Sequence, residues 1–356
     1  MSQRTLSKQE LTPTPDLNTS IQHTRADFGA KIVTLFEEYP LELDCGTQLS
    51  SIQVAYHDYG QPAEHAYLVC HALTGSSAAH LWWWELFEVG SLLDPAEAYT
   101  VCSSVLGSCV GTSGALEFGN LPITIGDMVR VQRELLEHLG VRKVSVLGGS
   151  MGGMQVLEWV RTFPEMLERV AIIAAPQKQT VWSRGFNVVA RALIVEDPAW
   201  NGGHYLEQPR GLALARMLGM LTYRSPESLE AEQSGPSKVK QNQSAIESYL
   251  EYQAKKLLER FDAQCYLLMI NAMDAFDVPD AALEFNTVPV LVVGISSDVR
   301  YPAANCSELA AKLPCSEYWE MVSPYGHDAF LVEMNALERR LRAFFAVKRE
   351  ASSRRF

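Results

Sequence analysis

The chain has 356 residues, of which 47% are hydrophobic and 20% are charged, and its formal net charge is −12. This composition is that of a globular protein with one large α/β domain, or one domain that carries a sizeable insertion. The acidic balance without a basic patch argues against a nucleic-acid partner. The absence of an apolar run of about 18 residues argues against a membrane span.

The N-terminal residues and the cysteines favour a cytoplasmic protein. Residues 1–30 are rich in polar residues and have no apolar core of signal-peptide length, so we expect a flexible tail and no export signal. The seven cysteines are scattered and form no CxxC pair. This pattern favours reduced thiols over a disulfide framework or a zinc site, and we expect no metal.

Short apolar strands alternate with helical patterns along most of the chain. The predicted strands lie at 66–70, 99–102, 144–147, 169–174 and 288–295, and the predicted helices lie at 125–139, 152–162 and 331–345. Such alternation is typical of a mostly parallel sheet flanked by helices.

The stretch at 178–286 breaks this alternation. It has helical patterns at 211–221, 245–260 and 264–274 but no clear strand. We interpret it as a helical lid domain inserted into an α/β core that is made of residues 31–177 and 287–356.

A serine enclosed by glycines lies between a predicted strand and a predicted helix. Residues 148–152 read Gly-Gly-Ser-Met-Gly, the G-x-S-x-G pattern of a nucleophile elbow. Small residues allow the sharp turn that exposes the hydroxyl of Ser150, and the helix that follows directs N–H groups at a developing oxyanion. The alternative is a glycine-rich turn with an incidental serine. The strand before and the helix after favour a nucleophile and an α/β-hydrolase fold.

A serine nucleophile needs a base and an acid, which in this architecture follow it in the order Ser, acid, His. Asp298 follows a predicted strand, and His327 precedes the last predicted helix. Asp274 and Asp277 are poorer candidates for the acid because they fall in the predicted lid. We expect Ser150 to attack, His327 to act as general base and then general acid, and Asp298 to orient the imidazole.

The oxyanion hole needs two backbone N–H donors. Met151 directly follows the nucleophile, and Leu73 lies in the loop after an early strand, so the N–H groups of these two residues are the candidates. His71 lies in the same loop but precedes Ser150 in the chain. We expect it to brace the loop and not to act as the base.

Several longer stretches resemble the homoserine O-acyltransferase family, over about residues 40–345. They are HALTG at 71–75, LGSCVGTSG at 106–114, GGSMGGMQVLEW at 148–159, FNVVARALIVEDPAWNGGHY at 186–205, GLALARMLGMLTYRS at 211–225 and GHDAFLVE at 326–333. The resemblance implies a ping-pong transfer of an acyl group from acyl-CoA, through Ser150, to the hydroxyl of homoserine on the route to methionine. It also implies a homodimer, and acyl-CoA as a co-substrate with no further cofactor.

The resemblance extends to substrate-binding residues. The three predicted triad residues match the family triad, Arg216 and Tyr223 match the pair near the homoserine carboxylate, and Asp328 matches the residue that receives the amine. An amino acid carries both charges, so its site needs a cation and an anion. Arg216 interrupts an apolar run, which favours a role away from bulk water over the alternative of a surface cation.

Members of the family differ in acyl donor and acceptor. HALTG and GGSMGGMQ are closer to the acetyl-using members than to the succinyl-using ones, which often read NALSG and GGSLGG, and no clear extra cation is seen for a succinyl carboxylate. The segment ALEFGNLP after GTSG is shorter than the usual family loop, which leaves the specificity open. We expect acetyl-CoA and L-homoserine as substrates. A succinyl donor, a serine acceptor and a plain esterase are the alternatives.

Overall fold

The computed structural model describes residues 29–346, so the tail predicted at residues 1–30 lies almost entirely outside the described residues. The strands are β1 (Lys31–Leu35), β2 (Leu41–Glu42), β3 (Gln48–Leu49), β4 (Ile52–Tyr59), β5 (His65–Cys70), β6 (Thr100–Ser103), β7 (Lys143–Gly149), β8 (Leu167–Ile173), β9 (Val290–Ile295) and β10 (Ser316–Met321). Eight of them form one sheet in the order β1-β4-β6-β5-β7-β8-β9-β10. Strands β6 to β10 in this order are parallel, whereas β4 pairs antiparallel with β1 and β6.

Helices cover both faces of this sheet. Those of the α/β core are α2 (Ala79–Trp82), α3 (Ala115–Phe118), α4 (Ile125–His138), α5 (Met151–Thr162), α11 (Ala303–Lys312), α12 (Ala329–Val332) and α13 (Met334–Phe345). Short 3-10 helices are η1 (Trp84–Phe87), η2 (Pro164–Met166), η3 (Pro198–Gly203), η4 (Asp280–Ala282) and η5 (Gly326–Asp328). The result is an α/β-hydrolase architecture, as predicted.

The side chains of the buried strands belong to two separate hydrophobic clusters. Leu68 and Val146 belong to the cluster that contains the buried faces of α4 and α5. Val69 and Leu147, the next residues along the same strands, belong to the cluster that contains α12 and α13. Because successive side chains of a strand point to opposite faces, this division buries the sheet on both sides. The ends of β5, β7 and β9 are thereby held in one rigid layer.

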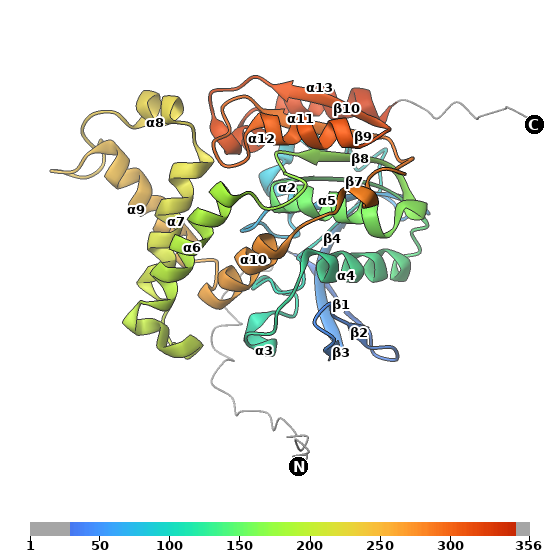
Figure 1. The fold of residues 1–356 in the computed structure, drawn as a ribbon, viewed down its shortest axis with the longest axis horizontal. Helices are drawn as coiled ribbons and strands as arrows, with labels where there is room; N and C mark the ends of the chain where they lie inside the picture. The colour runs from blue at the N-terminus through green and yellow to red at the C-terminus, as the bar shows by residue number, and fades with distance from the viewer. Residues whose placement is uncertain (1–28, 347–356) are drawn as a thin grey trace, which may run out of the picture.

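The segment between β8 and β9 is helical. It contains α6 (Val181–Val195), α7 (Arg210–Tyr223), α8 (Pro226–Gln233), α9 (Ala245–Leu258) and α10 (Ala263–Ala275). In Figure 1, α6 to α9 extend to one side of the sheet, while α10 returns toward α4 and α5. The buried side chains of α10 join the same hydrophobic cluster as those of α5. That residues 178–286 act as a lid domain stays a prediction.

Several elements differ from the sequence-based prediction. The pattern predicts one helix over 331–345, whereas the structure has α12 and α13, which are separated at Glu333 (φ −103°, ψ 49°). Strands β1 to β4 and β10 have no counterpart among the predicted strands, and α2, α3, α6, α8 and α11 have none among the predicted helices. Strand β10 is an edge strand whose sequence SEYWEM is mostly exposed or half-buried, so it lacks the apolar pattern on which a strand prediction depends.

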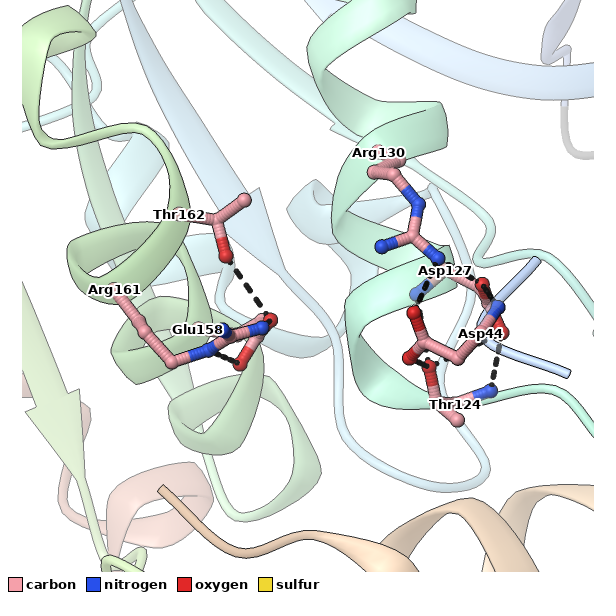
Figure 2. Close-up of polar contacts among 7 residues, drawn as sticks. All are labelled: Asp44, Thr124, Asp127, Arg130, Glu158, Arg161 and Thr162. Carbon is pink, nitrogen blue, oxygen red and sulfur yellow. Dashed lines mark hydrogen bonds and ion pairs between the residues drawn. The ribbon is translucent and has the colours of Figure 1, made fainter. Parts of the chain in front are cut away.

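A polar network fixes the start of α4 (Figure 2). The Thr124 hydroxyl accepts a hydrogen bond from the Asp127 N–H (3.1 Å), and the Asp127 carboxylate accepts one from the Thr124 N–H (2.8 Å). This arrangement is a capping box. Asp127 also accepts from the Asp44 N–H (3.0 Å), and Arg130 pairs with Asp44 (2.7 Å). The network thus joins α4 to the loop between β2 and β3.

None of the helices within 29–346 has the length and apolar run needed to cross a bilayer.

Candidate active site

Ser150 lies at the sharp turn between β7 and α5. Its backbone has φ 59° and ψ −122°, which is a strained conformation for a residue with a side chain. Its neighbours permit the turn: a Cβ on Gly152 would collide with the carbonyl oxygen of Cys70, and one on Gly149 would lie 2.7 Å from the ring of Phe330. The turn therefore has the geometry of a nucleophile elbow.

The structure brings the three predicted triad side chains into one hydrogen-bonded row. His327 Nε2 lies 2.8 Å from Ser150 Oγ, and His327 Nδ1 lies 2.6 Å from Asp298 Oδ2. With the ring proton on Nδ1, His327 donates to Asp298 and its Nε2 accepts from the serine hydroxyl. All three residues are buried, being 3–6% exposed. This is the arrangement in which an imidazole can remove the serine proton.

Backbone and loop contacts hold Asp298 and His327 in place. Asp298 Oδ1 accepts from the N–H groups of Arg300 (2.8 Å) and Tyr301 (2.9 Å), so both carboxylate oxygens are oriented. Ser297 Oγ accepts from the Gly326 N–H (2.9 Å) and so joins the loop that carries the acid to the loop that carries the histidine. The acid and the base are therefore positioned by one connected loop structure.

The loop after β5 lies against the same site. The His71 ring donates from Nδ1 to the Ala72 carbonyl (2.8 Å), and its Nε2 accepts from the Val105 N–H (3.0 Å). Burial lowers the pKa of His71 to about 4, so the ring is neutral and supports these two bonds at neutral pH. His71 thus braces the loop. Leu73, two residues on, lines the cavity beside Ser150.

Met151 is the first residue of α5, so its N–H belongs to the group that a helix leaves unpaired at its N-terminus. That the N–H groups of Met151 and Leu73 form the oxyanion hole stays a prediction. In both cases the position is set by the end of a central strand, β5 for Leu73 and β7 for Met151.

A cavity of about 280 Å³ opens over the serine. The residues predicted for the site that line it are Leu73, Ser150, Arg216, Tyr223, His327 and Asp328. Asp298 lies behind His327 and does not line the cavity. Side chains from the α/β core and from α7 therefore meet around one space.

Arg216 and Asp328 provide opposite charges in this cavity. The Arg216 guanidinium lies 5.5 Å from the centre of the Tyr223 ring, and its Nε is buried without a hydrogen-bond partner among the described residues. Burial raises the pKa of Asp328, while the neighbouring His327 and Arg216 oppose the rise. A buried donor without a partner and a desolvated carboxylate are both groups that a charged ligand would satisfy.

The cavity holds two arginines that the sequence-based prediction did not name. Arg260 and Arg300 line it together with Arg216, which corrects the expectation that no clear extra cation lies near the acyl site. Arg260 follows α9 and Arg300 follows Asp298 by two residues. Only the folding of distant segments onto one cavity reveals them, although the closeness of Arg300 to the predicted acid is a signal in the sequence.

Asp274, the poorer candidate for the acid, is held in an ion pair and a hydrogen bond away from the triad. Its carboxylate pairs with Arg191 (2.6 Å) and accepts from Asn187 (2.8 Å). Among residues 29–346, His, Cys, Asp and Glu side chains form no group of three or more that could hold a metal ion.

The sheet order, the strained serine at the β7–α5 turn and the row Ser150–His327–Asp298 define an α/β hydrolase in the broad structural sense. A family profile described as "alpha/beta hydrolase fold" matches residues 68–333. A solved acetylester hydrolase from Corynebacterium glutamicum has a TM-score of 0.79 at 22% identity, covering 90% of this chain and 97% of that one. At this identity the likeness shows the fold alone, and fold does not settle the reaction.

Sequence relatives define a narrower group. The chain is 47% identical over 321 residues to a homoserine O-acetyltransferase from Deinococcus radiodurans, covering 89% of this chain and 93% of the relative. It is 40% identical to one from Chloroherpeton thalassium, covering 91% and 92%. The chain belongs to the homoserine O-acetyltransferase family.

Proposed function

We propose that this protein transfers the acetyl group of acetyl-CoA to the side-chain hydroxyl of L-homoserine, as a step of methionine biosynthesis. Its family membership and its triad support an acyltransferase. The observation that carries the choice of acceptor is the presence of both a cation, Arg216, and a carboxylate, Asp328, in the cavity that contains Ser150. An amino acid presents a carboxylate and an ammonium group, and this cavity offers a partner for each.

In the first half of the reaction Ser150 takes the acetyl group. His327 removes the hydroxyl proton as Ser150 Oγ attacks the thioester carbonyl, and the negative charge that develops on the carbonyl oxygen is received by the N–H groups of Leu73 and Met151. The C–S bond then breaks. His327 returns the proton to the departing thiolate, so that coenzyme A leaves as a thiol. Asp298 stabilises the imidazolium throughout.

In the second half homoserine replaces coenzyme A. Its carboxylate pairs with Arg216 and its ammonium with Asp328, which directs the side-chain hydroxyl at the acetyl-serine ester. His327 takes the hydroxyl proton, the new ester bond forms, and the proton passes to Ser150 Oγ as it leaves. Binding of the acceptor by both charges favours its attack over that of water.

Steady-state release of coenzyme A thiol tests this proposal. With acetyl-CoA, we expect rapid thiol release when L-homoserine is present and slow release with water alone or with serine. Arg216→Met should raise the KM for homoserine, because it removes the carboxylate partner. Thiol release at one rate with and without any amino acid would instead indicate an esterase, the competing function that the same triad supports.

The proposal includes a cytoplasmic homodimer. All seven cysteines lie in the described region and none forms a disulfide, which suits a reducing compartment. The outer surface of α6 exposes Val188 and Val189, each about half accessible, beside a groove that reaches Leu214 of α7. An apolar groove of this kind is typical of an interface. Light scattering on the eluting protein should give twice the 39.6 kDa chain mass, and Val189→Glu should reduce it to one chain.

A further inference from the structure

Arg300 is a buried cation beside the triad. It is 3% exposed and lines the cavity over Ser150. Its guanidinium donates to Asn187 Oδ1 (2.9 Å) and to the Thr222 hydroxyl (3.3 Å). The rings of Tyr223 and Tyr301 lie 5.5 and 5.8 Å from the guanidinium carbon. The guanidinium is therefore held by neutral groups and by two aromatic faces.

No carboxylate of the described chain neutralises this charge. Among residues 29–346, none lies within ion-pair distance of Arg300, Arg216 or Arg260. Asn187 does connect Arg300 to Asp274, because its amide donates to that carboxylate (2.8 Å). However, Asp274 is already paired with Arg191 at 2.6 Å. The contact through Asn187 therefore does not neutralise the charge of Arg300.

The cavity as a whole has an excess of positive charge. Three arginines line it, and Asp328 is the one carboxylate among its lining residues. Of the three, Arg300 is buried, Arg216 is half-buried and Arg260 is exposed. A buried cation is costly unless an anion joins it. If the homoserine carboxylate occupied Arg216 alone, the other buried charge would remain uncompensated.

We propose that Arg300 is a second carboxylate-binding residue of the active site, which pairs with a substrate carboxylate beside the Tyr223 ring that Arg216 also approaches. Both guanidinium carbons lie 5.5 Å from the centre of that ring. Two substrate groups have this chemistry: the α-carboxylate of the amino-acid acceptor, and the terminal carboxylate of a dicarboxylic acyl group such as succinyl. The inference rests on the proposed acyl transfer and identifies a residue that determines its specificity.

Arg300→Met tests the pairing because it removes the charge and keeps an apolar stem between the two rings. Arg300→Lys retains the charge, and Arg340→Met is a matched control since Arg340 pairs with Glu317 at the surface. Homoserine binding is measured by calorimetry in a Ser150→Ala background, where no acyl transfer occurs. Acylation of Ser150 by acetyl-CoA and by succinyl-CoA is measured by rapid mixing and intact-mass spectrometry in protein that retains Ser150.

If the acceptor is the partner, Arg300→Met weakens homoserine binding by about tenfold or more and leaves the binding of 3-aminopropan-1-ol, which has no carboxylate, unchanged. If the acyl group is the partner, the variant slows acylation by succinyl-CoA about tenfold or more and leaves acylation by acetyl-CoA unchanged. In either case Arg300→Lys should recover part of the loss, and Arg340→Met should behave as wild type.

The proposal is overturned if Arg300→Met, with wild-type thermal stability, leaves both comparisons unchanged. It is also overturned if the variant weakens every ligand and both donors by one factor together with a fall in Tm, which is the result expected of a purely structural arginine. Failure of the proposed function has a different signature: wild-type Ser150 would take no acyl group, while the calorimetric comparison of homoserine with 3-aminopropan-1-ol would still report on Arg300.

Discussion

The row Ser150–His327–Asp298 depends on the hydrogen bonds of each member. Asp298 Oδ2 accepts from the imidazole at 2.6 Å, while its other oxygen accepts two backbone N–H groups. These bonds keep the acceptor oxygen directed at Nδ1, which in turn keeps Nε2 free of a proton and able to act as a base.

Asp298→Asn should therefore move the ring proton of His327 from Nδ1 to Nε2. The amide can present N–H to His327 Nδ1, which favours the tautomer with a proton on Nε2, facing Ser150. We expect kcat to fall by about 10⁴-fold with the fold unchanged, since removal of this charge in serine triads has an effect of that size. Homoserine-dependent thiol release and far-UV circular dichroism measure the two quantities. A loss below tenfold would show that Asp298 is not the acid of the triad.

Asp328 should give the reaction a dependence on low pH. Its pKa is raised, chiefly by burial, so its carboxylate takes up a proton at a higher pH than an ordinary aspartate as the pH falls. Protonation removes the partner of the substrate ammonium. We expect kcat/KM for homoserine to fall on acidification through this raised pKa. Asp328→Asn should raise the KM above that pKa, where wild type carries the charge, and change it little below.

Hydrolysis of a simple acetyl ester is the control for this profile. It uses the triad but presents no ammonium group, so its pH profile contains no contribution from acceptor binding at Asp328. Identical pH profiles for the ester and for homoserine, in wild type and in Asp328→Asn, would remove Asp328 from acceptor binding.

At the level of elements, the segment that carries His327 is packed tightly against the start of α8. Gly326 has φ 68°, and a Cβ there would lie 2.5 Å from the Ser225 nitrogen and 2.7 Å from the Arg224 carbonyl carbon. Ser225 is also the N-cap of α8 and donates from its hydroxyl to the Pro324 carbonyl. The helical segment between β8 and β9 thus holds the histidine loop directly.

Gly326→Ala should displace η5 and with it His327. We expect kcat to fall by at least about tenfold, because small displacements of catalytic groups are costly to rate. Gly140→Ala is the matched control: it also has a left-handed backbone (φ 77°) but no neighbouring atom within 4 Å of the added Cβ. It should cost about 1–2 kcal/mol of stability and leave kcat unchanged. Equal kcat for the two variants would contradict the packing argument.

The capping box of α4 should contribute to stability without affecting activity. Thr124→Ala leaves the Asp127 N–H without its side-chain acceptor and removes the hydroxyl contact to Asp44 (Figure 2). We expect the free energy of unfolding in urea to fall by about 1 kcal/mol, with the KM for homoserine unchanged. Thr162→Ala, which removes a hydroxyl at the last turn of α5, should cost less. A larger loss for Thr162→Ala would contradict the role assigned to the box.

For the whole molecule, local sequence signals predicted the central strands β5, β7, β8 and β9, since each is an apolar run bounded by turns. The order Ser150, Asp298, His327 could be predicted for the same reason: each residue follows or precedes a recognisable element. Strand β10 could not be predicted, because an exposed edge strand has no apolar pattern. The position of Arg300 beside Arg216 could not be predicted either. It depends on how α7 packs against the loop after β9, which no local pattern encodes.

The central claim is that Ser150 carries an acetyl group between two substrates. Intact-mass spectrometry after brief mixing with acetyl-CoA tests it most directly. We predict a mass gain of one acetyl group, located on Ser150, lost from wild type when L-homoserine is added and never formed by Ser150→Ala. The absence of any adduct with acetyl-CoA or succinyl-CoA, alongside hydrolysis of simple esters, would contradict the claim and leave an esterase.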